Sequence, residues 1–94
     1  MKDWPFADPE NVAVFTTIQV MRLGQPILYA SHDDEDGAWQ FHTGVAGASE
    51  GDAMVVSLSE VVEHDPTIRQ LADLPCGWLA ERDDIGSPWR RSQK

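Results

Sequence analysis

Residues 26–43, PILYASHDDEDGAWQFHT, contain two runs of alternating apolar and polar residues on either side of four consecutive carboxylates and a glycine. This alternation predicts two half-buried strands, Pro26 to His32 and Ala38 to Thr43, because neighbouring side chains along a strand point to opposite faces. An Asp-Gly pair, Asp36-Gly37, directly precedes the second run and is typical of a tight turn. The stretch therefore predicts an antiparallel β-hairpin.

The register of this hairpin depends on the length of its loop. If Asp36 and Gly37 are the only turn residues, His32 lies opposite Phe41 and Ala30 opposite Thr43. A longer loop through the acidic run would shift this pairing. In the first register the apolar side chains share the core face and the polar ones share the other. The core set is Leu28, Ala30, Trp39 and Phe41, and the other set is Tyr29, Ser31, Gln40 and His42.

Capping and turn residues mark the other elements. Ser57 with Glu60 three residues later has the spacing of a capping box, and Asp65 before Pro66 is a favoured helix start. In chain order we predict a strand at 12–15, a helix at 17–23, strands at 26–32, 38–43 and 53–56, helices at 58–64 and 67–73, and a strand at 77–82. This order predicts an α+β fold, a small mixed or antiparallel sheet of about five strands with two or three short helices mainly on one face.

Length and composition favour a single domain. The chain has 94 residues, of which 41% are hydrophobic and 24% charged, close to ordinary globular usage. We expect residues 1–11 to form an irregular arm, 12–82 the core, 44–52 a mobile surface loop and 83–94 a polar tail. Of the four tryptophans, at least one of Trp39 and Trp78 should be buried in the core.

The charge is unevenly distributed along the chain. Between Leu23 and Ile68 there are nine carboxylates and no lysine or arginine, and the seven basic and seven acidic residues elsewhere cancel, so the formal charge of −9 arises in this segment. An acidic surface repels phosphate backbones and anionic lipid, and it accelerates encounter with cationic molecules. We therefore expect a basic protein partner, with neither nucleic acid nor membrane as a partner.

The single cysteine, Cys76, excludes an internal disulfide, and the sequence begins with no charged-then-apolar leader. A cytoplasmic location is the expectation from these two features. No apolar run approaches the roughly 20 residues that span a bilayer. The setting Leu-Pro-Cys-Gly-Trp predicts a turn that carries a small buried or half-buried thiol rather than a nucleophile.

Arg82 ends a predicted strand in a chain that has few bases. It lies beside Glu81, Asp83 and Asp84. We expect an internal salt bridge here in preference to a clamp for a ligand.

No motif for a metal, a cofactor or a catalytic nucleophile stands out. The run from His32 to Gly37 is as acidic as a calcium loop, but it lacks the alternating ligands and the closing glutamate, which favours a solvated hairpin tip. The chain contains no H-E-x-x-H pattern either. We expect no enzymatic activity; the alternative is a small-ligand or hydrolytic site at the hairpin, built from His32, His42 and the neighbouring acids.

Several short motifs together resemble a known family. They are Gly-x-Trp-x-Phe-x-x-Gly at residues 37–44, the helix starts Ser57-Leu58 and Asp65-Pro66, and a Pro-x-Gly stop at 75–77 before a strand that ends in Glu81-Arg82. Over residues 12–82 the chain resembles small bacterial proteins catalogued as the domain of unknown function DUF2185, which are grouped with immunity proteins of polymorphic-toxin systems. The resemblance implies an α+β protein without established catalytic residues that binds and neutralises another protein, and it transfers no functional residue.

Two interpretations of the acidity follow from the sequence. In the first, the protein is a protein-binding module, immunity-like, whose carboxylates engage a basic, toxin-like partner by charge-assisted hydrogen bonds. In the second, the acidity serves only solubility. The oligomeric state stays open between monomer and homodimer. For the first interpretation the candidate partner-binding residues are Asp33, Asp34, Glu35, Asp36, Glu60 and Glu63.

Overall fold

A computed structural model describes residues 4–44 and 52–93 of the chain, so most of the expected surface loop at 44–52 lies outside the described residues. The elements are β1 (Ala13–Thr17), α1 (Ile18–Met21), β2 (Tyr29–His32), β3 (Trp39–His42), β4 (Ala53–Ser57), α2 (Leu58–His64), the 3-10 helix η2 (Pro66–Leu71), β5 (Trp78–Glu81) and β6 (Arg90–Gln93). This arrangement confirms the α+β class. No helix within the described ranges is long and apolar enough to cross a membrane.

All six strands belong to one mixed sheet, in the order β4-β1-β3-β2-β5-β6. β1 and β3 run parallel, and the other neighbours are antiparallel. The strand beyond the expected five is β6, in the segment that we expected to be a polar tail. Its four residues are all polar and exposed, so they lack the alternation that marks a half-buried strand.

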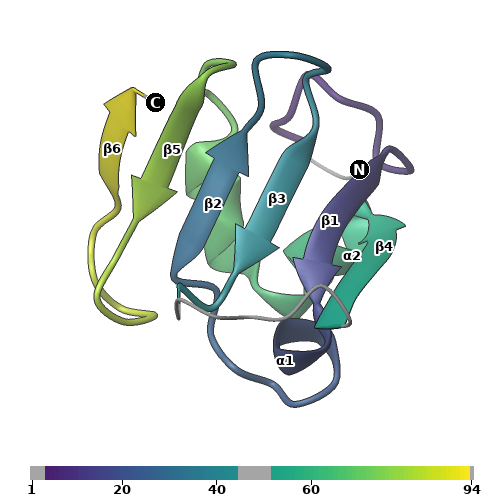
Figure 1. Cartoon of the computed structure of the whole chain (residues 1–94), viewed down its shortest axis with the longest axis vertical. Coiled ribbons are helices and arrows are strands. Elements are labelled where there is room, and N and C mark those ends of the chain that lie inside the picture. The colour runs from purple at the N-terminus through teal and green to yellow at the C-terminus, as the bar shows by residue number, and fades with distance from the viewer. Residues whose placement is uncertain (1–3, 45–51, 94) are drawn as a thin grey trace.

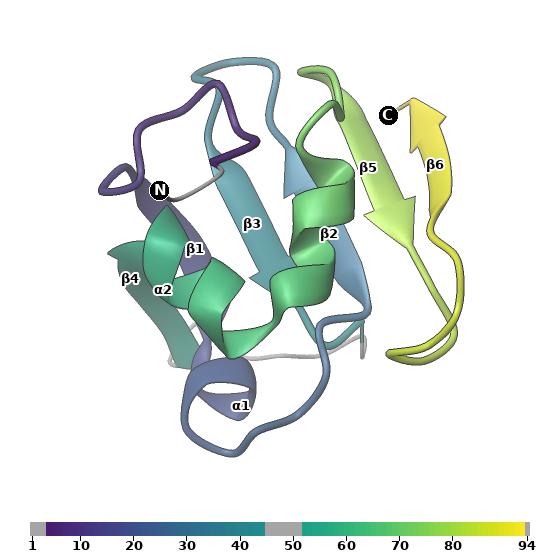
Figure 2. The same cartoon turned by 180° about the vertical axis from the view of Figure 1, so that it is seen from behind.

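The helices α2 and η2 pack against one face of the sheet (Figure 2). Between these two layers lies the core, which contains Trp39, Phe41, Val61 and Leu71. Trp39 is only 1% exposed, which confirms that one of the two candidate tryptophans is buried. The arm before β1 adds Phe6 to the core, where its ring meets Trp39 edge-on at a centroid distance of 5.5 Å.

The caps of the helices explain where they begin. The predicted capping box of α2 is present, with the Ser57 side chain accepting from Glu60 N and the Glu60 side chain accepting from Ser57 N. Asp65 caps the following helix, which is a 3-10 helix. The first helix is shorter than predicted and begins after Thr17, whose hydroxyl accepts from Val20 N.

The register of the central hairpin corrects the tight-turn expectation. His32 lies opposite Trp39 and Ala30 opposite Phe41, two residues away from the predicted pairing. Because the shift is an even number, the paired side chains keep their predicted faces. Ala30, Trp39 and Phe41 are accordingly buried against the helices. Leu28, which we expected in the core set, lies before β2 and is only half-buried, and the fully buried residue at this point is Ile27.

Candidate partner-binding surface

The acidic run forms the tip of the β2–β3 hairpin, at one end of the sheet (Figure 1). Asp33 N donates to Ala38 O at 2.7 Å, and Gly37 N donates to Asp33 O at 3.0 Å, so residues 34–37 make the loop. Gly37 adopts φ 71°, which glycine reaches without the steric cost that a side chain brings. Asp36 Oδ1 then accepts from Ala38 N at 3.0 Å. These bonds order the loop and leave the side chains of residues 34–36 exposed.

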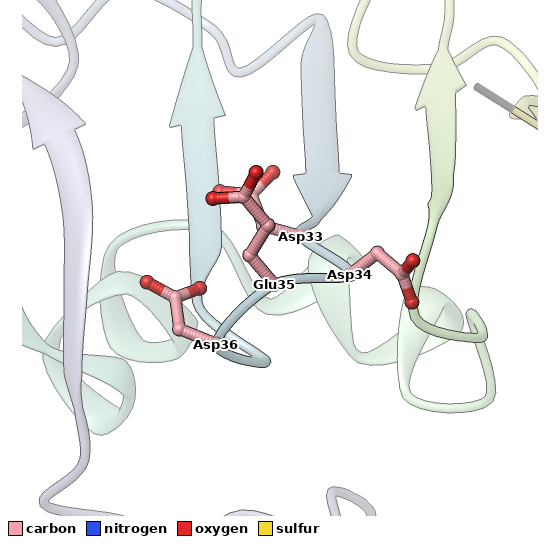
Figure 3. A pocket seen from close by; sticks show the side chains of 4 residues that line it. All are labelled: Asp33, Asp34, Glu35 and Asp36. Atoms are coloured by element: carbon pink, nitrogen blue, oxygen red, sulfur yellow. The ribbon is translucent and has the colours of Figure 1, made fainter.

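Four carboxylates line an open hollow of about 430 Å³ at this tip, namely Asp33, Asp34, Glu35 and Asp36. Figure 3 shows that Asp34 points toward the start of β5 and Asp36 away from it, while the carboxylates of Asp33 and Glu35 overlap in this view. Carboxylates that diverge in this way do not form the converging oxygen shell that a hard cation requires. Within the described residues no group of three or more His, Cys, Asp or Glu side chains could hold a metal ion.

Asp33 differs from its three neighbours because it folds back onto the sheet. Its carboxylate accepts from Ser31 Oγ at 3.2 Å and from Gln40 Nε2 at 2.7 Å. Gln40 Oε1 in turn faces His42 Nε2 at 3.0 Å. Because the amide oxygen only accepts, His42 Nε2 is the donor of this bond. Asp33 therefore stabilises the β2–β3 face, whereas residues 34–36 carry the outward charge.

The environment of His42 favours its neutral form. Burial lowers the pKa of this imidazole below 6.5, and the negative charge of Asp33 opposes the effect only in part. The ring packs beside Tyr29 at a centroid distance of 5.7 Å. A neutral His42 can donate this hydrogen bond through Nε2, so the network of Asp33, Gln40 and His42 does not require a protonated imidazole at neutral pH.

Apolar side chains continue this open face toward the β4 edge. Phe15 on β1 is paired in register with Gln40 and with Val55, so all three lie on the face opposite to α2 and η2. Phe15 is 42% exposed and Val55 63% exposed. None of the described helices packs on this face, which Figure 1 shows toward the viewer. The face therefore offers apolar contact area next to the Asp33 network.

The six predicted partner-binding residues fall into two groups. Asp33, Asp34, Glu35 and Asp36 form the hairpin tip, whereas Glu60 and Glu63 lie on α2, on the covered side of the sheet (Figure 2). The carboxylate of Glu60 also accepts from Ser57 N and Ser57 Oγ, at 3.2 and 3.0 Å, as part of the helix cap. The hairpin group is thus the contiguous acidic surface.

The histidines of the alternative hydrolytic site are not brought together. His42 lies on the open face, whereas His32 lies on the core side, where its ring stacks on Trp39 at 4.0 Å. His64 lines a different, smaller hollow together with Asp65 and Ile85. The described linings of the hollow at the hairpin tip and of the hollow beside His64 share no residue.

Sequence reasoning missed a contact between Cys76 and His32, which are 44 positions apart. Cys76 is exposed, which corrects the expected buried or half-buried thiol, and its Sγ lies 3.5 Å from His32 Nε2. The contact arises because β2 and β5 pair with His32 opposite Trp78. No local motif encodes this pairing, and only the correct strand order would have predicted it.

The resemblance to the immunity-protein family stays a hypothesis, because no family model, curated protein or solved structure matches the chain.

Proposed function

We propose that this chain is a non-catalytic protein-binding module that engages a basic protein partner through its hairpin tip. The observation that carries the proposal is the ordered loop that holds Asp34, Glu35 and Asp36 exposed at one end of the sheet. Ion pairs between described side chains involve Asp65, Asp73 and Asp83, and none of the three tip residues. Their charge is therefore available to a partner.

The chemistry of the tip suits a cationic cleft. Ionised carboxylates on an ordered loop accept charge-assisted hydrogen bonds from Arg and Lys without first losing much conformational freedom. An immunity-like protein that blocks a nucleic-acid-cleaving toxin would need this kind of surface, because the cleft of such a toxin is built to hold phosphate. The cytosol is the compartment in which such an inhibitor would act.

The open sheet face would complete the interface. Phe15 lies beside Gln40, which binds Asp33 at the base of the tip. Apolar area next to a charged anchor is the usual composition of a protein interface, in which aromatic side chains supply affinity and exposed charges supply association rate. A higher salt concentration should then lower the association rate far more than it raises the dissociation rate of the complex.

The test uses matched charge-neutral variants. The tip variant is Asp34→Asn, Glu35→Gln and Asp36→Asn together. The control variant is Glu81→Gln, Asp83→Asn and Asp84→Asn, which changes the charge equally near the end of β5 that pairs with Tyr29, away from the tip. Proteins retained by immobilised wild type at low salt are identified, and the association rate of the purified basic candidate is measured with each variant.

We expect the tip variant to associate about tenfold more slowly at low salt, with a smaller difference at high salt, because steering contributes 10-fold or more to such rates. The control variant should stay within about twofold of wild type, since exposed charges far from the contact are screened. Equal effects of the two variants, or the absence of any basic partner retained by wild type, would contradict the proposal.

A further inference from the structure

Cys76 and His32 form a thiol–imidazole pair at the start of β5. Cys76 lies in the turn from Pro75 to Trp78, in which Trp78 N donates to Pro75 O at 3.2 Å and Gly77 adopts φ 85°. This turn leaves the thiol exposed, with Sγ 3.5 Å from His32 Nε2. A nucleophile and a base are thus within hydrogen-bonding reach at the surface.

The hydrogen bonds of His32 determine which nitrogen is the base. Nδ1 lies 2.7 Å from Leu74 O, and a carbonyl oxygen can only accept, so Nδ1 carries the proton. In the neutral ring Nε2 then has its lone pair directed at the thiol. The ring stacks on Trp39 with an interplanar angle of 13°, and Trp39 Nε1 donates to Asp8 Oδ1 at 3.2 Å. Leu74 O and the Trp39 ring therefore hold the base in position, as a third group does in thiol nucleophile sites.

We propose that Cys76 is a reactive thiol that exchanges with small disulfides, with His32 as its base. In this step the Cys76 proton passes to His32 Nε2 while Sγ attacks one sulfur of the disulfide. The disulfide bond breaks, a mixed disulfide forms on Cys76, and the leaving thiolate takes the proton back from His32. Cys76 is oxidised, and half of the small disulfide is reduced to a free thiol.

The surroundings of the pair select the charge of the reagent. Asp34 packs against the turn, since a methyl group on Gly77 would lie 3.7 Å from both Cβ and Cγ of Asp34. The exposed carboxylates of Glu35 and Asp36 follow it along the loop. This negative charge attracts cations and repels anions, so the site should take cationic or neutral disulfides in preference to dicarboxylate ones.

The first test measures how fast the intact protein forms a mixed disulfide with cystamine at pH 7, followed by mass spectrometry. Loss of His32 removes the base that takes the proton from the thiol, so the reaction should become slower. We expect His32→Gln to react about tenfold more slowly than wild type. The control His64→Gln changes an exposed histidine on α2 and should stay within about twofold. Cys76→Ser shows that the adduct is on the cysteine, the only one in the chain.

The second test uses wild type alone, so it does not depend on the folding of a variant. Cystamine is compared with the dianionic dithiodipropionate, and each rate is divided by that of the same reagent with N-acetylcysteine amide. We expect cystamine to be favoured about tenfold at low salt and less at high salt. A His32→Gln rate within about twofold of wild type, or a normalised preference for dithiodipropionate, would overturn the proposal. No binding partner takes part, so either result leaves the protein-binding proposal to its own test.

Discussion

Removal of the negative charge from Asp65 is expected to destabilise the fold strongly, because this residue neutralises a buried arginine. Arg82 Nη2 lies 2.8 Å from Asp65 Oδ2, and the two side chains are only 1% and 5% exposed. The internal salt bridge expected for Arg82 therefore exists, although its partner is a residue 17 positions away rather than one of its three acidic neighbours. The change to test is Asp65→Asn, which keeps the shape of the side chain.

The size of the destabilisation follows from the contacts that Arg82 would keep in Asp65→Asn. Its Nε donates to Ile27 O at 2.9 Å, its Nη1 donates to Thr67 Oγ1 at 2.9 Å, and its guanidinium lies 4.1 Å from the centre of the Trp89 ring. These contacts satisfy donors but supply no countercharge. Breaking a buried pair in this way costs about 3–5 kcal/mol. A chain of this length is stable by roughly 5–14 kcal/mol in total, so the loss is a large fraction of its stability.

Urea and thermal unfolding of wild type and Asp65→Asn measure this cost. A loss of about 3–5 kcal/mol corresponds to a fall in Tm of roughly 12–40 °C for a domain of this size. The matched control is Asp83→Asn, which removes an exposed pair in which Arg90 Nη2 lies 3.1 Å from Asp83 Oδ1 and the side chains are 60% and 76% exposed. That control should cost less than about 1 kcal/mol.

A second variant separates the charge effect from a packing effect. Asp65→Leu combined with Arg82→Met removes both charges, so no ion remains buried without a partner, and we expect it to regain part of the stability lost in Asp65→Asn. The reasoning is refuted if Asp65→Asn costs no more than Asp83→Asn, because water would then be solvating the Arg82 guanidinium despite its burial.

Three further predictions concern the hairpin and the first helix of the α2–η2 layer. Gly37→Ala should lower the free energy of unfolding by about 1–2 kcal/mol in urea, because Gly37 has φ 71°; no change would show that the loop rearranges. Ser57→Ala should cost about 1 kcal/mol in the same assay by removing the cap of α2, and a neutral result would mean that Glu60 or water replaces it. Burial lowers the pKa of His42 below 6.5, so the unfolded chain binds this proton more readily, and stability should fall as the pH drops below 6.5. The free energy of unfolding of wild type and of His42→Gln, measured between about pH 5 and 8, gives the contribution of this histidine, and a difference between the two proteins that does not change with pH would contradict it.

The faces of the central hairpin could be predicted from the sequence, whereas its register could not. The alternation of apolar and polar residues assigns each residue to one face of the sheet, and this assignment does not change when the pairing of the strands shifts by two residues. The tight turn would have placed Asp34 opposite Trp39 on the core face. A carboxylate buried there without a partner would be costly, so the longer loop is the stable solution. Four adjacent carboxylates were thus a signal for loop length as well as for charge.

The features that the sequence could not predict all depend on contacts between distant segments. β6 has no apolar alternation, and its Arg91 reaches Asp73 at 2.8 Å and Gln70 O at 2.7 Å next to η2. Arg82 has three acidic neighbours in sequence, yet strand geometry turns it toward Asp65. Local spacing identifies helix caps well, because a cap is a local contact, but it carries no information on which residues the sheet order brings together.

The four-residue loop also connects the two proposed sites. Because residues 34–37 leave the ladder, Asp34 can lie against Gly77 in the turn that carries Cys76, while Gly77 N donates to His32 O at 2.7 Å. A tight turn would have kept Asp34 within the strand pairing and away from that turn. The same carboxylate that contributes to the acidic tip therefore also adds negative charge beside the turn that carries the thiol. It follows that Asp34→Asn alone should reduce both the steering of a basic partner and the preference for cystamine, whereas Glu81→Gln, near the opposite end of β5, should reduce neither.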